Sequence, residues 1–276
     1  MATSRRSTDR LAGALALAVL LVAAAPGRAR ANIRAPQVTP RAPSGALAPS
    51  PPSPQVRVLG ETLTFTCDAA ACDVAAAYRV SASAPADLTL AFILPTAERV
   101  MAQVGTASGS GAAIPVTVGP SEPLHDDDVP REERMGYADH PPPVYQARFT
   151  APVTAGENRI AVTYRQPLGQ YERDHGYLKK GRFLDFFRYE IWPLDEWQRA
   201  RDFQVQGAVV ITRPAPSWWQ RTFHHVRSIG CRGMEPPART LLEQRGDQLR
   251  FQFQLSEPLP RRLWCFMGDD DLVSKP

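Results

Sequence analysis

Four cysteines are the residues whose type and spacing point most directly to chemistry. Cys67 and Cys72 lie at the junction of two segments that both resemble strands, VRVLGETLTFTC and CDVAAAYRV. Neighbouring antiparallel backbones at a non-hydrogen-bonded site lie about 4.5 Å apart at Cα, which a disulfide accepts. We therefore predict a disulfide across a hairpin. A redox-active pair is disfavoured, because C-x-x-C spacing is absent and no strand-to-helix unit places a thiol at a helix N-terminus.

The other two cysteines, Cys231 and Cys265, would close a much longer ring. Four cysteines allow three pairings, and the sequence does not choose among them. The local hairpin favours Cys67 with Cys72, which leaves Cys231 with Cys265. The chain-entropy model gives about 2 kcal/mol for the short ring and about 4 kcal/mol for the long one.

A stretch of acids and histidines is the second candidate for chemistry. His125, Asp126, Asp128 and His140 could supply ligands for calcium or zinc. Consecutive acids point in different directions on an extended chain, whereas a calcium loop alternates its ligands. The run is therefore more typical of a solvated loop. We predict no metal and no cofactor, and keep these four residues as weak candidates.

Signatures of known hydrolases are missing from the chain. It contains no G-x-S-x-G, H-E-x-x-H or S-x-x-K motif and no glycine-rich phosphate loop. The sequence therefore favours a protein that is not an enzyme. A metal-dependent or acid–base hydrolase with its site in the 120–140 loop is the alternative.

Aromatic residues suggest a binding function. Trp218 and Trp219 follow the segment Pro214–Pro216, in a loop where a core position does not explain them. Flat rings can stack against sugar rings, and exposed aromatic pairs often mark contact sites. The opposing interpretation is that tryptophan in a β-sandwich normally packs between the sheets, as Phe187 and Tyr189 are expected to do. We predict binding residues only at Trp218 and Trp219.

The first 31 residues have the form of an export signal. Three arginines (Arg5, Arg6 and Arg10) precede an apolar stretch at 11–25, and an A-x-A cleavage site at 29–31 follows. The apolar stretch is shorter than the roughly 20 residues that span a bilayer. We expect a cleaved signal peptide, by the general secretory route rather than the twin-arginine route, and a periplasmic or extracellular protein with no transmembrane segment.

Cleavage changes the charge of the chain. The whole sequence has 32 basic and 28 acidic residues, and the first 31 residues hold five arginines and one aspartate. Removing them leaves 27 of each, so the net charge of the mature chain is zero. Nucleic-acid binding needs a basic excess on one face. We therefore expect no nucleic-acid partner.

The remaining chain divides by composition. Residues 32–55 are rich in proline and are expected to form a spacer, since proline favours extended polyproline II. Residues 56–268 are expected to form one domain, with a long polar and acidic loop at 105–143. Residues 269–276 are expected to be a solvated polar tail.

Strand patterns dominate this domain. Segments such as LTLAFIL, NRIAVTY and LRFQFQL alternate apolar and polar residues or are apolar throughout, and they are separated by proline and glycine turns. The one notable helical candidate, at 194–200, is short. The pattern predicts an all-β fold, a two-sheet antiparallel β-sandwich with very little helix.

The order of several motifs resembles a known family. GETLTF, VAAAYRV, LAFILP, FTAPVTAGENRIAVTYRQPLG, YEIWPLDEW and RFQFQLSEPLPRRL follow one another over most of residues 58–263. In this respect the chain resembles a domain-of-unknown-function family of secreted bacterial proteins. That family has no established activity and no catalytic residues, so the resemblance implies an exported β-sandwich. Taken together, we expect a non-catalytic protein of the bacterial cell envelope that acts through surface contacts with protein or glycan.

Overall fold

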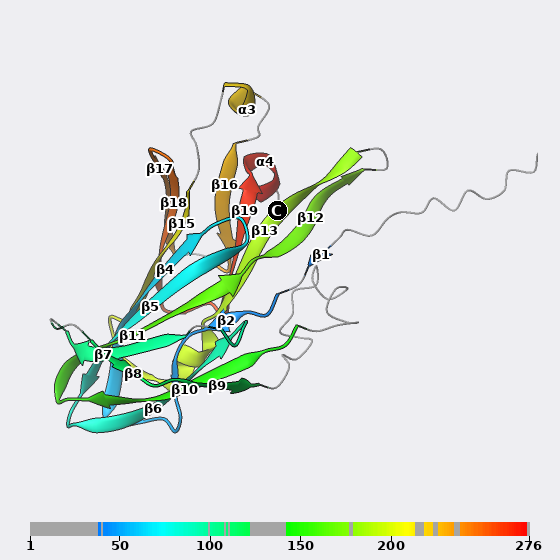
Figure 1. The fold of residues 1–276 in the computed structure, drawn as a ribbon. Coiled ribbons are helices and arrows are strands. Elements are labelled where there is room, and N and C mark those ends of the chain that lie inside the picture. Colours follow the sequence, from blue (N-terminus) through cyan, green and yellow to red (C-terminus); the bar gives the residue numbers. More distant parts are fainter. Residues whose placement is uncertain are drawn as a thin grey trace, which may run out of the picture. The chain divides into compact units, whose positions relative to one another are not determined.

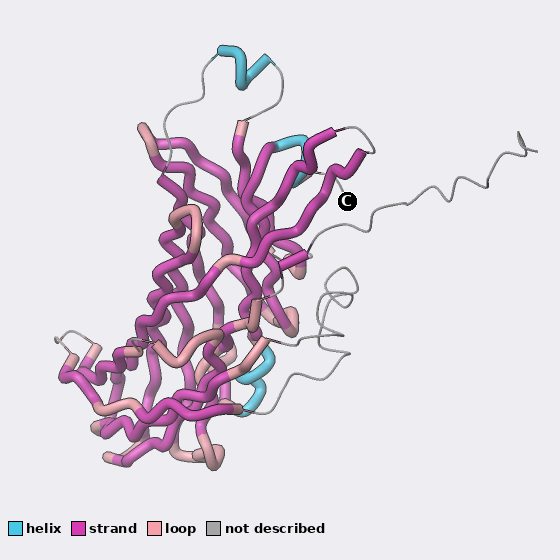
Figure 2. The backbone as a smooth tube through the Cα atoms, turned by 45° about the vertical axis from the view of Figure 1, so that its right-hand side comes forward, coloured by secondary structure: helices cyan, strands magenta, loops and turns pink. Residues whose placement is uncertain are grey.

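The protein is built almost entirely of strands in its computed structural model (Figure 2). Among the described residues, helix is limited to η2 (Trp192–Glu196), α3 (Trp218–Thr222) and α4 (Asp270–Val273). The predicted all-β class with very little helix is confirmed. The structure describes residues 38–39, 41–98, 100–107, 109, 111–121, 142–176, 179–212, 218–222, 226–234 and 238–274.

The largest sheet has nine strands. Eight of them follow the order β17-β18-β15-β4-β5-β11-β7-β8, and the short strand β14 pairs with β4 outside this order. Neighbours are antiparallel, except that β15 and β14 run parallel to β4. A parallel pair needs a long connection, and the chain passes through the other two sheets between β4 and β15. The strands are β4 (Val56–Cys67), β5 (Ala71–Ala82), β7 (Met101–Thr106), β8 (Ala112–Ile114), β11 (Gly156–Pro167), β14 (Gln198–Arg199), β15 (Gln204–Thr212), β17 (Arg239–Arg245) and β18 (Gln248–Ser256).

Two smaller sheets complete the fold (Figure 1). The six-stranded sheet has the order β1-β12-β13-β19-β16, with β2 paired to β13, and the four-stranded sheet has the order β3-β6-β10-β9. The sandwich therefore contains three sheets rather than two. The strands are β1 (Val38–Thr39), β2 (Ser44–Gly45), β12 (Gly169–Gly176), β13 (Lys179–Glu190), β16 (Arg227–Arg232) and β19 (Arg262–Asp269), and then β3 (Ala48–Pro49), β6 (Ala86–Leu94), β9 (Thr117–Pro120) and β10 (Tyr145–Val153).

The sheets pack through the apolar faces that alternation predicts. In β5 the buried positions alternate with exposed ones, and the rings of Phe65 in β4 and Phe187 in β13 stack with centroids 4.4 Å apart. Each fully buried side chain of this size contributes about 1.5–3 kcal/mol. Phe187 and Tyr189 are at most 1% exposed, which confirms the prediction that they belong to the core.

A β-bulge in β4 decides which of its side chains enter the core. The register of β4 on β5 shifts between Val58 and Gly60. Beyond the shift, Glu61, Leu63 and Phe65 are all buried. Because side chains alternate along a strand, simple alternation from Val58 would have placed Glu61 on the outer face. The bulge thus lets Val58 and Glu61, on either side of it, both face the interior.

The proline-rich segment 32–55 is not a loosely tethered spacer where the structure describes it. Ala42, Ala46 and Leu47 are at most 3% exposed, and β2 and β3 pair with strands of the two smaller sheets. The prediction was based on the preference of proline for extended polyproline II, a composition that was not expected to pack. A short extended segment of proline and alanine can nevertheless lie along a sheet edge, where a missing N–H costs little.

The C-terminal segment 269–276 also differs from its prediction as a solvated tail. Asp269 ends β19 and the next residues form α4, in which Leu272 is 1% exposed. Arg182 of β13 donates hydrogen bonds to Asp269 and Asp271 at 2.7 Å. The prediction was based on the charge of the aspartates alone. It did not foresee the ion pairs with Arg182 or the burial of Leu272. Part of the predicted loop 105–143 is likewise ordered, as β8 and β9.

Both predicted disulfides are present, and each joins residues directly opposite one another on neighbouring antiparallel strands. Cys67 is bonded to Cys72 between β4 and β5, and Cys231 is bonded to Cys265 between β16 and β19. Disulfides form and persist in oxidising compartments and are rare in the cytoplasm. The pairing therefore indicates a protein that matures outside the cytoplasm.

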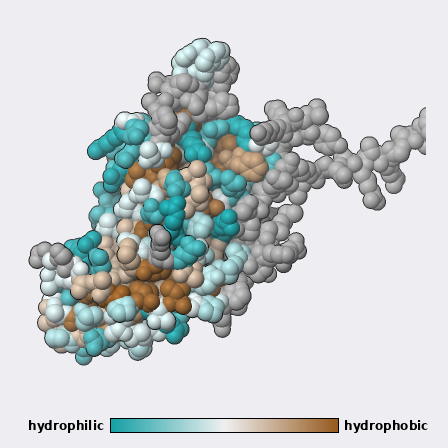
Figure 3. Space-filling view, in the orientation of Figure 1, coloured by the Kyte–Doolittle hydropathy of each residue, from teal (hydrophilic) through white to brown (hydrophobic). Residues whose placement is uncertain are grey.

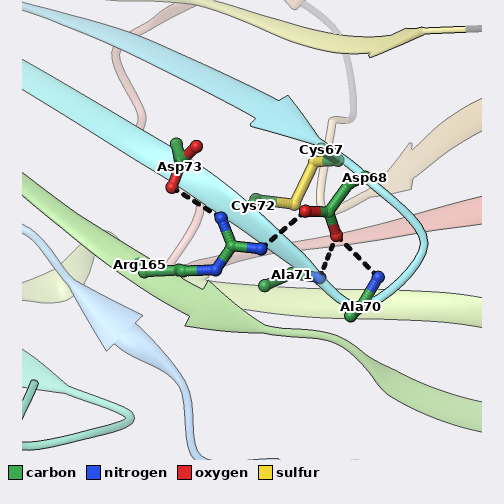
Figure 4. Close-up of polar contacts among 7 residues, drawn as sticks. All are labelled: Cys67, Asp68, Ala70, Ala71, Cys72, Asp73 and Arg165. Carbon is green, nitrogen blue, oxygen red and sulfur yellow. Dashed lines mark hydrogen bonds and ion pairs between the residues drawn. A yellow bond between two sulfur atoms is a disulfide. The ribbon is translucent and has the colours of Figure 1, made fainter.

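A polar network closes the first disulfide hairpin (Figure 4). One oxygen of Asp68 accepts hydrogen bonds from the backbone N–H groups of Ala70 and Ala71 at 2.7 and 2.8 Å. Arg165 of β11 donates to the other oxygen of Asp68 and to Asp73. The two backbone hydrogen bonds, followed by the one from Arg165, lower the pKa of Asp68 to about 2. The turn is thus held in place from within and from the next strand.

We predict that the two disulfides contribute unequally to stability. Replacing Cys231 and Cys265 together by alanine should lower the free energy of unfolding by about 4 kcal/mol, because the oxidised bond restricts a long loop in the unfolded chain. The same change at Cys67 and Cys72 should cost about 2 kcal/mol. Urea denaturation of the oxidised proteins measures both values, and an equal or reversed order would contradict this account.

Candidate functional site

The structure places Trp218 and Trp219 on the surface. Both lie in α3, beyond the ends of β15 and β16 (Figure 1). Their side chains are 63% and 55% exposed, although their rings stack on each other with centroids 4.1 Å apart and an interplanar angle of 29°. The other three tryptophans are covered: Trp192 is half-buried, and Trp197 and Trp264 are at most 7% exposed. The pair thus forms an apolar platform that the core does not require.

The candidate metal ligands are not tested by the structure. His125, Asp126, Asp128 and His140 lie outside the described residues, as does most of the 120–140 loop. Within the described ranges, no group of three or more histidine, cysteine or acidic side chains is arranged to hold a metal ion. The hydrolase alternative for that loop therefore stays a prediction.

A buried carboxyl–hydroxyl network joins the nine-stranded and six-stranded sheets. The hydroxyl of Tyr189 donates to Glu61 Oε1 at 2.6 Å, and the hydroxyls of Tyr189 and Tyr78 lie 3.0 Å apart. The hydroxyl of Tyr78 also accepts a hydrogen bond from the backbone N–H of Leu47 at 3.1 Å. Trp197 Nε1 donates to the carbonyl oxygen of Leu47 at 2.7 Å. The network therefore connects three strands with the proline-rich segment.

Burial determines the protonation of this network. It raises the pKa of Glu61 from 4.5 to about 7, although the hydrogen bonds of Tyr189 and Tyr78 lower it. Burial, assisted by the negative charge of Glu61, raises the pKa of both tyrosines well above 10. The second carboxyl oxygen, Oε2, has no hydrogen-bond partner among the described residues. Near neutral pH the carboxyl group is thus divided between its charged and neutral forms.

Sequence reasoning missed Glu61 as a buried group, but a signal for it exists. Counting back from Cys67, every second residue is Phe65, Leu63 and Glu61, so the alternation itself places the acid on the core face. Glu61 is 2% exposed. A group so enclosed has no access to a substrate, and we assign it a structural role.

Two of the open hollows in the described surface are lined without carboxyl, imidazole or thiol groups. One, of about 480 Å³, lies where β7, β8 and β10 meet, in the region where Figure 3 shows apolar side chains gathered. The other, of about 360 Å³, lies across β4, β15, β18 and β17 and is lined mainly by threonine, glutamine and arginine. Neither lining contains an acid, a histidine or a cysteine among the described residues. Neither can therefore supply a general acid or base from a carboxyl or imidazole group.

Comparisons with known proteins give little information about function. No protein-family model and no curated protein matches the chain. Among solved structures, the chain is similar to a "putative nutrient binding protein" from Legionella pneumophila, with 10% identity, a TM-score of 0.48, and coverage of 83% of this chain and 72% of that one.

Two further solved structures are similar over a smaller part of their length. One is a "putative protease" from Parabacteroides distasonis, at 8% identity and TM-score 0.34, of which this chain covers 41%. The other is yeast LTA4 hydrolase in complex with bestatin, at 8% identity and TM-score 0.33, of which it covers 29%. In both cases 78% of this chain is covered. At these values the similarities do not indicate what this chain binds.

We predict that Glu61 makes stability fall as pH rises. A carboxyl group whose pKa is higher in the folded state than in the unfolded state stabilises the fold fully below pH 4.5, and this contribution is lost as pH rises through about 7. Glu61→Gln keeps the acceptor for Tyr189 but cannot ionise. The free energy of unfolding of the variant, relative to that of the unmodified protein, should increase by up to about 3 kcal/mol when the pH is raised from 4.5 to 8.

Urea unfolding at both pH values measures this gain. Glu98→Gln, a change at an exposed glutamate, is the matched control and should show no such gain. A Glu61→Gln variant that follows the control at both pH values would show that the carboxyl group does not ionise differently on folding.

Proposed function

We propose that the protein is an exported, non-catalytic binding protein of the cell envelope, and that Trp218 and Trp219 bind glycan. The observation that carries the proposal is the exposure of two large apolar side chains that stack on each other instead of packing into a core. Exposed aromatic side chains of this kind mark contact sites. The disulfides support maturation outside the cytoplasm, where envelope glycans occur.

The size of the platform favours a sugar over a protein partner. Two indole side chains exposed to this extent present on the order of 250 Å². A stable protein interface needs about 800 Å² on each partner. A sugar ring is closer in size to the platform, and its C–H groups can pack on the electron-rich face of an indole. Mutual stacking also holds both rings in place before binding, which lowers the entropy cost.

None of the helices in the described part of the chain has the length and apolar composition needed to cross a bilayer. One further observation agrees with a binding role. The carboxyl group with the raised pKa, Glu61, is enclosed between two sheets and lines neither of the two hollows described above nor a third one of about 330 Å³, whose lining includes Asp68, Asp73 and Asp185. A rigid exposed patch is sufficient for binding, whereas catalysis needs titratable groups that converge in a cleft.

We predict that the double variant Trp218→Ala, Trp219→Ala loses binding to glycan without losing its fold. Purified mature protein should be captured by insoluble, protein-free cell-wall glycan, and the variant should be captured at least about tenfold less, which corresponds to about 1.4 kcal/mol. Because both side chains are exposed, the midpoints of thermal and urea unfolding should not change.

The matched control removes two exposed apolar side chains elsewhere. Leu241 and Leu242 of β17 are 51% and 45% exposed, and Leu241→Ala, Leu242→Ala should leave capture unchanged. Failure of the unmodified protein to bind any glycan preparation would refute the proposal, and so would equal capture of the tryptophan variant.

A further inference from the structure

The nine-stranded sheet ends in a long open edge at β17 (Figure 1). Among the described residues this strand pairs only with β18, so the backbone groups along its other side have no strand partner. Proteins protect such edges by keeping them very short, by covering them or by placing charges on them. At the opposite end of the sheet β8 has three residues, whereas β17 has seven. The edge at β17 is therefore long enough to pair with a further strand.

The turn between β17 and β18 determines which backbone groups point to this edge. Arg245 and Gln248 are paired, and the two residues between them form the turn. The pair that flanks a two-residue turn is hydrogen-bonded, and hydrogen-bonded and non-hydrogen-bonded pairs alternate along an antiparallel ladder. Arg245 and every second residue before it therefore direct their backbone groups to β18. Thr240 and Leu242 direct theirs to the open edge.

Both faces of this edge carry an exposed leucine. Leu241 lies opposite Gln252 on the outer face of the sheet, and Leu242 lies opposite the buried Phe251 on the core side. The two leucines are 51% and 45% exposed. A strand added along β17 would cover both of them.

Two charged groups of β17 can bind a partner. Arg239 is exposed and has no ion pair among the described residues. Glu243 binds Gln252 and Arg245 through Oε2, at 3.3 and 3.2 Å. Its other oxygen, Oε1, has no partner in the described part of the chain, and a carboxylate can accept several hydrogen bonds. A cation and a carboxylate oxygen, four residues apart on one face of the strand, thus remain for an external partner.

We propose that two copies of this chain pair along β17, antiparallel about a two-fold axis at Leu241, so that their nine-stranded sheets become continuous. In this register Arg239 of each copy lies opposite Glu243 of the other, and the two Leu241 side chains meet at the axis. Thr240 forms a hydrogen-bonded pair with Leu242 of the other copy. The two Leu242 side chains are then diagonal neighbours, which long side chains can bridge.

Charge selects this register over its neighbours. A two-fold axis at Leu242 would bring Arg239 opposite Arg245 of the other copy, and an axis at Glu243 would bring the two Glu243 carboxylates together. Like charges directly opposite each other destabilise a strand pair, whereas opposite charges stabilise it. An axis one residue nearer the N-terminus would place Arg239 opposite Leu241 and leave it without an acid. The charges of this edge therefore favour one way of pairing with a second copy.

The contact is small, so the dimer is weak. A strand edge of this length buries less than the about 800 Å² on each partner that a stable interface needs, and we expect a dissociation constant above about 10 µM. The glycan proposal concerns α3 instead, and cell-wall capture at about 1 µM protein tests it on the monomer. The two proposals therefore stand or fall separately.

Sedimentation equilibrium of the purified mature protein, from about 10 µM to about 1 mM, should show a monomer–dimer equilibrium. Arg239→Glu and Glu243→Arg should each weaken it at least about tenfold, because each places like charges opposite one another. An equimolar mixture of the two variants should restore the dimer, since one copy of each recreates both opposite-charge pairs. Arg159→Glu, at an exposed arginine of β11, is the matched control and should change nothing.

A proline variant tests the backbone hydrogen bonds separately. Thr240→Pro removes an N–H that points to the open edge, so the fold should persist, as thermal unfolding will show, while the dimer is lost. Thr240→Val keeps this N–H and should dimerise like the unmodified protein. The proposal would be overturned by a protein that stays monomeric at about 1 mM, by undiminished dimerisation of Thr240→Pro or of either charge variant, or by a folded mixture that does not dimerise.

Discussion

One enclosed acid lies at the centre of the hydrogen bonds that connect two sheets and the proline-rich segment. Glu61 faces the interior, together with Val58 on the other side of the bulge in β4, and there it accepts a hydrogen bond from Tyr189 of the opposite sheet. Tyr78, which lies opposite Glu61 on the neighbouring strand β5, links Tyr189 to the backbone N–H of Leu47 by hydrogen bonds. A buried carboxyl group is costly unless it is neutral or paired, so every element that supplies a partner is held to a specific position. The two sheets and the proline-rich segment are thereby fixed relative to one another.

This constraint explains why a segment of low predicted order is packed. Proline and alanine contribute little burial energy, and composition alone favours an extended, solvated chain. What retains the segment is a set of specific polar contacts: the backbone of Leu47 bonds to both Tyr78 and Trp197, and Ser44 bonds to Gln166 at 2.7 Å. These contacts join residues far apart in the sequence, so composition over a short window cannot predict them.

The sequence was informative where a pattern is local. Alternation identified the strands, and the spacing of Cys67 and Cys72 identified a hairpin disulfide, because both depend only on neighbours along the chain. Trp218 and Trp219 stood out for the same reason, since no alternation explained them. The third sheet, the parallel pairing of β15 with β4 and the partner of Asp269 depend on which distant strands meet. Local patterns contain no such information.

The two faces of β19 show how a disulfide can organise a surface at a distance. Cys265 faces the main core, and the residues on either side of it, Trp264 and Phe266, face a second, smaller apolar cluster on the other side of the sheet. If β19 were shifted by one residue relative to β16, its two faces would be exchanged. The rings of Trp264 and Phe266 would then enter the main core, which is already close-packed. The bond from Cys265 to Cys231 joins directly opposite residues and so fixes the register. The same bond therefore stabilises the sandwich and directs Trp264 and Phe266 to the outer face.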